Sequence, residues 1–302
     1  MHWKIKVLTQ FLLSRIPSGE QINYYLQTLD GSHSDANISR RIRIIAERLA
    51  FLYQHRTVEG AQVLEVGTGW VPLNPLLLYL LGAKEIHTYD HLPHLRLAVA
   101  KRSVVGLDRA IPTLAAALSV EESLLRHRLE PLQSAPTLEE LLSQANIIYK
   151  APADACHSGL ADKSVDLFYS YAVLEHVSRK VVAGLAKESA RVLKPSGIAF
   201  HVIGCQDPYN GGSVSKVDFL QYPEWAWKFF VKNRISYHNR MREKEYLSIF
   251  RSYGAEIVAV RSEIDASDVE LVRHLKIDKR FSGMTAEELA VNHSDVIYRF
   301  AT

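Results

Sequence analysis

Glycines and carboxylates at the ends of two predicted strands are the residues of this sequence best suited to chemistry. A β-branched run at 62–66 carries Glu65 and ends in Gly67-Thr68-Gly69, and a second apolar run ends at Asp90. Glycines let the backbone approach a ligand, and a carboxylate at the carboxyl end of a parallel strand can hold ribose hydroxyls. We therefore expect these residues to bind a nucleotide-like ligand.

The charge of these strand ends favours an adenosine over a pyrophosphate. A third acidic residue, Asp154, follows a later predicted strand, and three carboxylates along one sheet edge would repel a pyrophosphate. The dinucleotide-binding loop G-x-G-x-x-G also requires a third glycine. Val71 and Pro72 stand there instead, which disfavours a dinucleotide enzyme.

Strand and helix patterns alternate through most of the chain. Strands that alternate with helices predict a parallel sheet with right-handed crossovers, and the last two strands, joined by a long connection, predict an antiparallel edge. We expect a doubly wound α/β fold with a seven-stranded, mostly parallel sheet. The predicted strands are 62–66, 85–89, 146–149, 165–170, 197–203, 255–262 and 295–300, and the predicted helices are about 72–81, 93–103, 178–193 and 242–253.

The composition is that of an ordinary globular protein, with 302 residues, 47% apolar and 23% charged. A net charge of +3 does not favour nucleic acid, which requires a concentrated basic face. The basic cluster Ser39-Arg40-Arg41-Ile42-Arg43 is interpreted as one solvated helix face. Cys156 and Cys205 are far apart and match no zinc-ligand spacing, which favours a reducing, cytoplasmic setting.

The N-terminal stretch 1–16 mixes basic and apolar residues and lacks the pattern of a secretory signal. We expect an amphipathic helix that packs on the domain, with a position on a membrane surface as the alternative. No uncharged apolar run reaches the roughly 20 residues that span a bilayer.

From about residue 41 onwards the sequence resembles class I S-adenosylmethionine-dependent methyltransferases, in five segments that follow the order of that family. Segment 65–69 resembles the family's glycine-rich loop. The resemblance implies that Glu65, Gly67, Thr68 and Gly69 hold the methionine end of S-adenosylmethionine. Val71 departs from the fuller E-x-G-x-G-x-G form of that loop.

The other segments imply the rest of the cofactor site. Segment 164–177 resembles the fourth strand and its exit, and segment 191–197 resembles the turn before the fifth strand. The residues that the resemblance places beside the cofactor are Asp90 and His91 at the ribose, Asp154 and Ala155 at the adenine, and Ser170 and Tyr171 at the exit of the fourth strand.

Methyl transfer is an in-line displacement, so an oxygen acceptor benefits from a general base. The candidates are His176, Asp207 and His238, while His201 lies inside a predicted strand and is interpreted as a core residue. His176 follows Glu175 in a pair that often only supports structure in this family. Some relatives place a metal-binding Glu three residues before that Glu, but Ala172 stands there, so no metal is expected.

Three segments lie outside the minimal fold, and such segments over a rigid sheet edge carry specificity. We expect an N-terminal helical segment or lid at 1–56 and a methyltransferase domain at 57–302, with insertions at about 106–145 and 205–240 that help to enclose the acceptor. The predicted function is methylation of a small-molecule hydroxyl, on a saccharide or secondary metabolite. An N-methyltransferase, or a non-catalytic S-adenosylmethionine-binding protein on the same fold, is the alternative.

Overall fold

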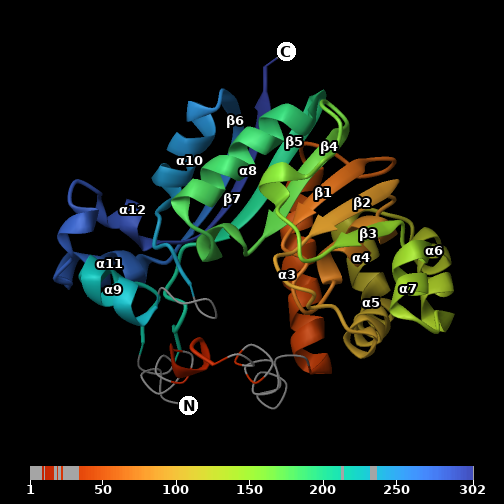
Figure 1. Ribbon diagram of the computed structural model, residues 1–302, viewed down its shortest axis with the longest axis horizontal. Coiled ribbons are helices and arrows are strands. Elements are labelled where there is room, and N and C mark those ends of the chain that lie inside the picture. The colour runs from red at the N-terminus through yellow and green to blue at the C-terminus, as the bar shows by residue number, and fades with distance from the viewer. Residues whose placement is uncertain are drawn as a thin grey trace.

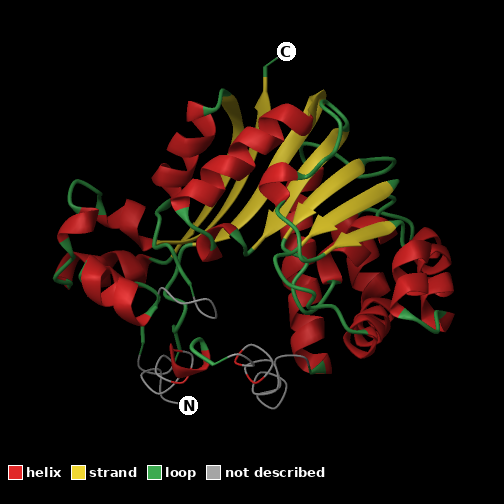
Figure 2. Ribbon diagram, in the orientation of Figure 1, coloured by secondary structure: helices red, strands yellow, loops and turns green. Residues whose placement is uncertain are grey.

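The computed structural model describes residues 9, 11–16, 19, 22, 34–211, 214–231 and 237–301. Its centre is a seven-stranded sheet in the order β3-β2-β1-β4-β5-β7-β6, with helices on both faces (Figures 1 and 2). This confirms the predicted fold class. The strands are β1 (Gln62–Val66), β2 (Glu85–Tyr89), β3 (Ile147–Lys150), β4 (Val165–Tyr171), β5 (Leu193–Gly204), β6 (Ala255–Ile264) and β7 (Val291–Phe300).

The order of the strands reverses in the middle of the sheet. β1, β2 and β3 follow one another outwards on one side, and β4 and β5 continue on the other, all in parallel pairs. β7 is antiparallel to both β5 and β6, so the antiparallel strand lies beside the edge strand β6. The reversal between β1 and β4 opens a crevice at their carboxyl ends, which is where α/β sheets bind ligands.

One face of the sheet is covered by helices from the first half of the chain. The side chains of Val63, Ile86 and Leu167 point into this core. α3 and α5 pack tightly at Gly106, because a Cβ at that position would lie 2.6 Å from Cγ2 of Ile38. The helices are α3 (Asp35–Tyr53), α4 (Leu73–Leu80), α5 (Leu97–Leu118), α6 (Glu122–Ser134) and α7 (Leu138–Gln144).

The opposite face is covered by α8 (Arg179–Val192) and α10 (Glu243–Ser252). The residues next in sequence to those of the first core, Leu64 and Phe168, point to this side, because side chains alternate along a strand. These strands are therefore buried on both faces, as parallel strands are.

A third hydrophobic cluster forms a helical lobe beside the end of the sheet (Figure 1). It joins residues 214–231 to residues 266–290 around Phe219, Trp227 and Phe281. Half of the predicted insertion 205–240, residues 214–231, thus packs against a later part of the chain. The elements of the lobe are η3 (Asp218–Gln221), α9 (Glu224–Phe230), α11 (Ala266–His274), η4 (Lys279–Phe281) and α12 (Ala286–Ala290).

The segment 106–145 is helical, as expected, but it begins inside α5. The helix predicted for residues 1–16 falls largely outside the described residues. Among the helices that the structure describes, none has the length and apolar character to cross a membrane.

Candidate active site

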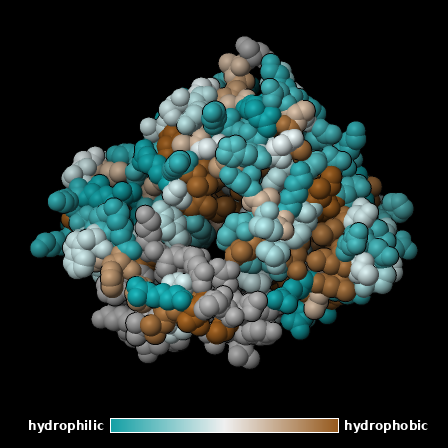
Figure 3. All heavy atoms as spheres, viewed as in Figure 1, coloured by the Kyte–Doolittle hydropathy of each residue, from teal (hydrophilic) through white to brown (hydrophobic). Residues whose placement is uncertain are grey.

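A cavity of about 370 Å³ lies at the crevice between β1 and β4. Its walls come from the loop after β1, the exits of β2 and β4, and the first half of α3. The surface is hollowed near the centre of the view in Figure 3, with hydrophobic side chains at its base. Among the predicted cofactor residues, those that line the cavity are Gly67, Thr68, Gly69, Asp90, His91 and Tyr171.

The loop after β1 follows a path that only glycine takes without strain. Gly67 and Gly69 have φ angles of +83° and +67°, in the left-handed region. A Cβ on Gly67 would also lie 2.3 Å from Cγ2 of Val173. The loop is tied to β2, because the Gly67 amide donates to the carbonyl of Tyr89 at 2.8 Å and the Gly69 amide donates to Oδ2 of Asp90 at 2.7 Å.

Glu65 lies beneath this loop and not in the cavity wall. Thr88 donates to its Oε2 at 2.5 Å, and the hydroxyls of Thr68 and Thr88 are 2.5 Å apart. Oε1 is buried without a hydrogen-bond partner in the described part of the chain. Burial raises the pKa of Glu65 to about 8, although the Thr88 hydrogen bond opposes this. A cation placed at this end of the cavity would favour the ionised carboxylate.

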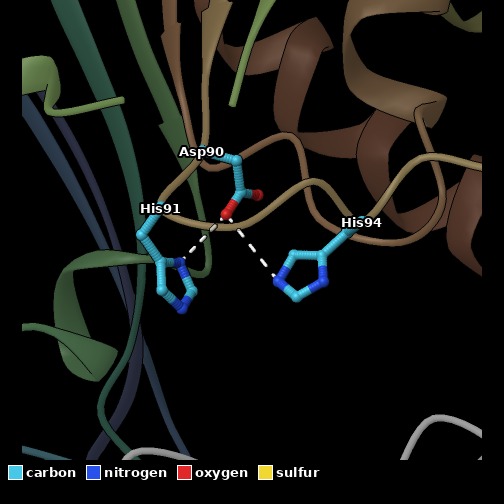
Figure 4. Close-up of side chains that lie close together, drawn as sticks. All are labelled: Asp90, His91 and His94. Carbon is cyan, nitrogen blue, oxygen red and sulfur yellow. Dashed lines mark hydrogen bonds and ion pairs between the residues drawn. The ribbon is translucent and has the colours of Figure 1, made fainter. Parts of the chain in front are cut away.

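Asp90 is buried at the exit of β2 and held by several donors (Figure 4). Its Oδ1 lies 3.0 Å from Nδ1 of His91 and 3.8 Å from Nε2 of His94. Burial alone would raise the pKa of Asp90, but the hydrogen bonds from His91 and Gly69 and the nearby His94 outweigh it and lower the pKa. The carboxylate is therefore ionised and fixed, as binding of a ribose diol requires.

The same three side chains could also hold a cation. One ligand atom from each of Asp90, His91 and His94 lies within 4.8 Å of the others, and two imidazoles with a carboxylate suit a transition metal. Both imidazoles face the same carboxylate oxygen (Figure 4). A metal and a ribose diol would therefore compete for Asp90, and the sequence-based expectation of no metal stays a prediction.

The side chains of Ser170 and Tyr171 point in different directions at the exit of β4. Tyr171 lines the cavity. Ser170 is fully buried, and its Oγ lies 2.7 Å from Nδ1 of His201. Burial lowers the pKa of His201 to about 3, so this imidazole is a neutral core residue, as expected from its strand position. Only the backbone of Ser170 is left to contact a ligand.

The predicted adenine residues lie outside the cavity wall. Asp154 is exposed and caps the 3-10 helix η1 (Ala155–His157), where it accepts from the amide of Cys156 at 2.9 Å and lies 3.0 Å from Nδ1 of His157. Ala155 is buried in the core beneath α8. The structure brings Asp90 to the cavity wall, whereas Asp154 caps η1, and a contact of Asp154 with the adenine stays a prediction.

The three candidate bases are placed very differently. His176 is exposed and lines the cavity. Asp207 is buried, its Oδ1 accepts from the amide of Tyr209 at 2.8 Å, and burial raises its pKa to about 6. His238 is buried among the rings of Phe219 and Trp227, and burial lowers its pKa well below the usual value. Of the three, only His176 reaches this cavity.

Several cavity residues were not identified from the sequence. The rings of Trp70 and His94 are in tilted contact, with centroids 4.1 Å apart. Oδ1 of Asn74 accepts from the hydroxyl of Tyr169 at 3.0 Å. Arg41 lines the cavity, although Arg40 and Arg43 are exposed as expected for a solvated face. The helical period could have predicted that Arg41 faces the protein, because Arg41 lies three residues after the core residue Ile38 and four before the core residue Ile45.

A known protein family matches the middle of the chain. Residues 92–201 match the family described as a methyltransferase domain. This segment includes β4 with its exit and leads into β5. Over this segment the chain is similar to a methyltransferase domain. S-adenosylmethionine is its methyl donor. None of the curated proteins compared with the chain matches it.

Solved structures of methyltransferases are similar to the chain over most of its length. An S-adenosylmethionine-dependent methyltransferase from Mesorhizobium loti is 17% identical, with a TM-score of 0.46, over 84% of this chain and 97% of that one. A putative sarcosine dimethylglycine methyltransferase from Galdieria sulphuraria is 16% identical, with a TM-score of 0.47, over 87% of this chain and 86% of that one. Similarity at this level does not bear on the acceptor.

Proposed function

We propose that this methyltransferase acts on a hydroxyl group of a small molecule, with His176 as the general base. The donor would lie across the exits of β1 and β2, with its ribose on Asp90. A cavity of about 370 Å³ is within the range of small-molecule sites. The acceptor would approach from the exit of β4, where His176 lies.

The hydrogen bond between His176 and a backbone carbonyl is the observation that supports a base. Nδ1 of His176 lies 2.9 Å from the carbonyl oxygen of Tyr237. Because a carbonyl only accepts, Nδ1 carries the proton, and the neutral ring then has a free lone pair on Nε2. That lone pair can take the proton of a hydroxyl as its oxygen attacks the methyl group. The oxygen–methyl bond forms as the sulfur–methyl bond breaks, and the sulfonium becomes a neutral thioether.

The test replaces His176 by Gln and measures methyl transfer from labelled S-adenosylmethionine to the small molecules of a cell extract. We expect kcat to fall by about 100-fold or more, as for a lost general base, while donor affinity stays unchanged. The matched control is His157→Gln, because His157 is exposed and bonded only to Asp154 among the described side chains. A near-full rate in His176→Gln would contradict the role of base.

That contradictory result would favour the N-methyltransferase alternative. A neutral amine attacks through its own lone pair and releases its proton after transfer, so it needs less help from a base. Identification of the labelled product as an amine would then replace the hydroxyl acceptor.

A further inference from the structure

Arg41 is a cation in the cavity wall with no counter-charge among the described residues. It is half-buried, and within the described part of the chain its guanidinium forms neither an ion pair nor a hydrogen bond. Its electrostatic neighbour is the hydroxyl of Tyr171, and burial lowers the pKa of Arg41. A charge removed from water without a partner is costly, so a cation here indicates an anion that arrives with a ligand.

Arg48, two turns later on the same helix, shows what a structural arginine looks like at this interface. It contacts Oδ2 of Asp295 at 3.2 Å and Oε1 of Glu263 at 2.6 Å. Both arginines project from the face of α3 that carries Ile45 and is turned toward the protein. Arg48 is neutralised by the fold, whereas Arg41 is left for the contents of the cavity.

We propose that Arg41 is an anion-binding residue of the cavity that takes a carboxylate from a bound ligand. A guanidinium presents a planar fork of donors that matches a carboxylate in a bidentate pair. The cavity wall also carries an ionised carboxylate at Asp90, which repels an acid at that end. Charge therefore orients the ligand, with its acidic group at Arg41 and its hydroxyl-rich part at Asp90.

Two ligands could supply the carboxylate. S-adenosylmethionine carries one on its methionine end, and the acceptor could itself be an acid. The first source does not depend on which atom of the acceptor is methylated. The second rests on the proposed function and defines its acceptor as an anionic small molecule.

Calorimetric titration with two donors separates these sources. One is S-adenosylmethionine, and the other is its decarboxylated analogue, which keeps the sulfonium, amine and ribose. Wild type, Arg41→Gln, Arg41→Lys and the control Arg40→Gln are compared, since Arg40 is exposed on the same helix. If the donor supplies the anion, wild type binds S-adenosylmethionine at least about tenfold more tightly than the analogue. Arg41→Gln then removes this preference, Arg41→Lys keeps part of it, and Arg40→Gln leaves it intact.

The second arm uses methyl-labelled donor and a cell extract, with products separated by anion exchange. If the acceptor supplies the anion, wild type and Arg40→Gln label acidic products, and Arg41→Gln loses them with donor affinity unchanged. The proposal is overturned if wild type does not distinguish the two donors and its labelled products are not acids. That result comes from wild type alone, so it does not depend on whether the Arg41 variants fold. If His176 is not the general base, the preference of wild type for S-adenosylmethionine over its analogue and the charge of the labelled products should still be those expected above. Failure of the proposed function can therefore be distinguished from failure of the proposal for Arg41.

Discussion

The strand exits of the sheet and the helical lobe beside it differ in how their residues are brought together. At the exits of β1 and β2, Gly67, Gly69 and Asp90 meet through hydrogen bonds that follow from parallel register. In the lobe, Phe219 and Phe281 meet only because two segments far apart in sequence pack together. The comparison teaches that the donor side of this enzyme is set by local patterns, whereas the lobe is set by long-range packing.

The largest expected effect is on donor binding at a strand exit. Asp90→Ala removes the carboxylate proposed for the ribose and the acceptor for the Gly69 amide. Two hydrogen bonds to a charged group contribute about 3 kcal/mol or more, so we expect the Kd of S-adenosylmethionine to rise by about 100-fold or more. Asp154→Ala is the matched control and should change that Kd by less than about threefold, because Asp154 is exposed and outside the cavity wall. Equal losses in both variants would place the adenine on Asp154.

The lobe should lose stability instead of donor affinity. Arg242, just before α10, joins the lobe to the sheet. It is fully buried and donates to the carbonyl of Leu289 in the lobe and to the carbonyls of Cys205 and Val291 next to β5 and in β7. Arg242→Met leaves three acceptors unsatisfied, so we expect the free energy of unfolding in urea to fall by about 3 kcal/mol.

The exposed Arg299 provides the control, since Arg299→Met removes only a surface ion pair with Glu256. The folded Arg242→Met protein should bind S-adenosylmethionine as wild type does. A variant that keeps its stability but loses the donor would contradict the division between strand exits and lobe.

Much of the donor side could be predicted from the sequence because neighbouring strand ends lie at one sheet edge. The bounds of β1 and β2, the glycine loop and Asp90 needed only local periodicity and strand order. Asp154 and Ser170 show the limit. Their position along a strand exit was clear, but the direction of each side chain depends on a helix cap and on His201.

The lobe could not be predicted in the same way. Asp207 and His238 lie in a segment without clear periodicity. Asp207 is held by the amide of Tyr209, and His238 is buried against the rings of Phe219 and Trp227. Arg41 could have been found, because its helical face is encoded by Ile38 and Ile45. The missing information was which part of that face meets the cavity.

A smaller effect should appear with pH at Glu65. Its pKa of about 8 in the folded protein exceeds the ordinary value of 4.5. Its contribution to stability is therefore complete below about pH 4.5 and is lost as the pH rises to about 8. We expect the Tm of the ligand-free protein to fall between pH 6 and 8.5 by more than in Glu65→Gln. Donor affinity should rise over the same range, because the cationic methionine end favours the ionised carboxylate. A wild-type profile that matches Glu65→Gln would contradict this.

The smallest expected effect is that of metal removal. A ribose on Asp90 would occupy the carboxylate that a metal would need, so we expect EDTA to leave kcat and KM unchanged in the methyl-transfer assay. Added zinc should act only as a competitor of the donor. Loss of activity in EDTA that zinc restores would show instead that Asp90, His91 and His94 form a working metal site.

The most direct test of the account is a crystal structure with S-adenosylhomocysteine, the product of the donor. We predict that its ribose hydroxyls lie within hydrogen-bond distance of Asp90 and its methionine end lies against Gly67. A nucleoside bound away from the exits of β1 and β2 would contradict the account.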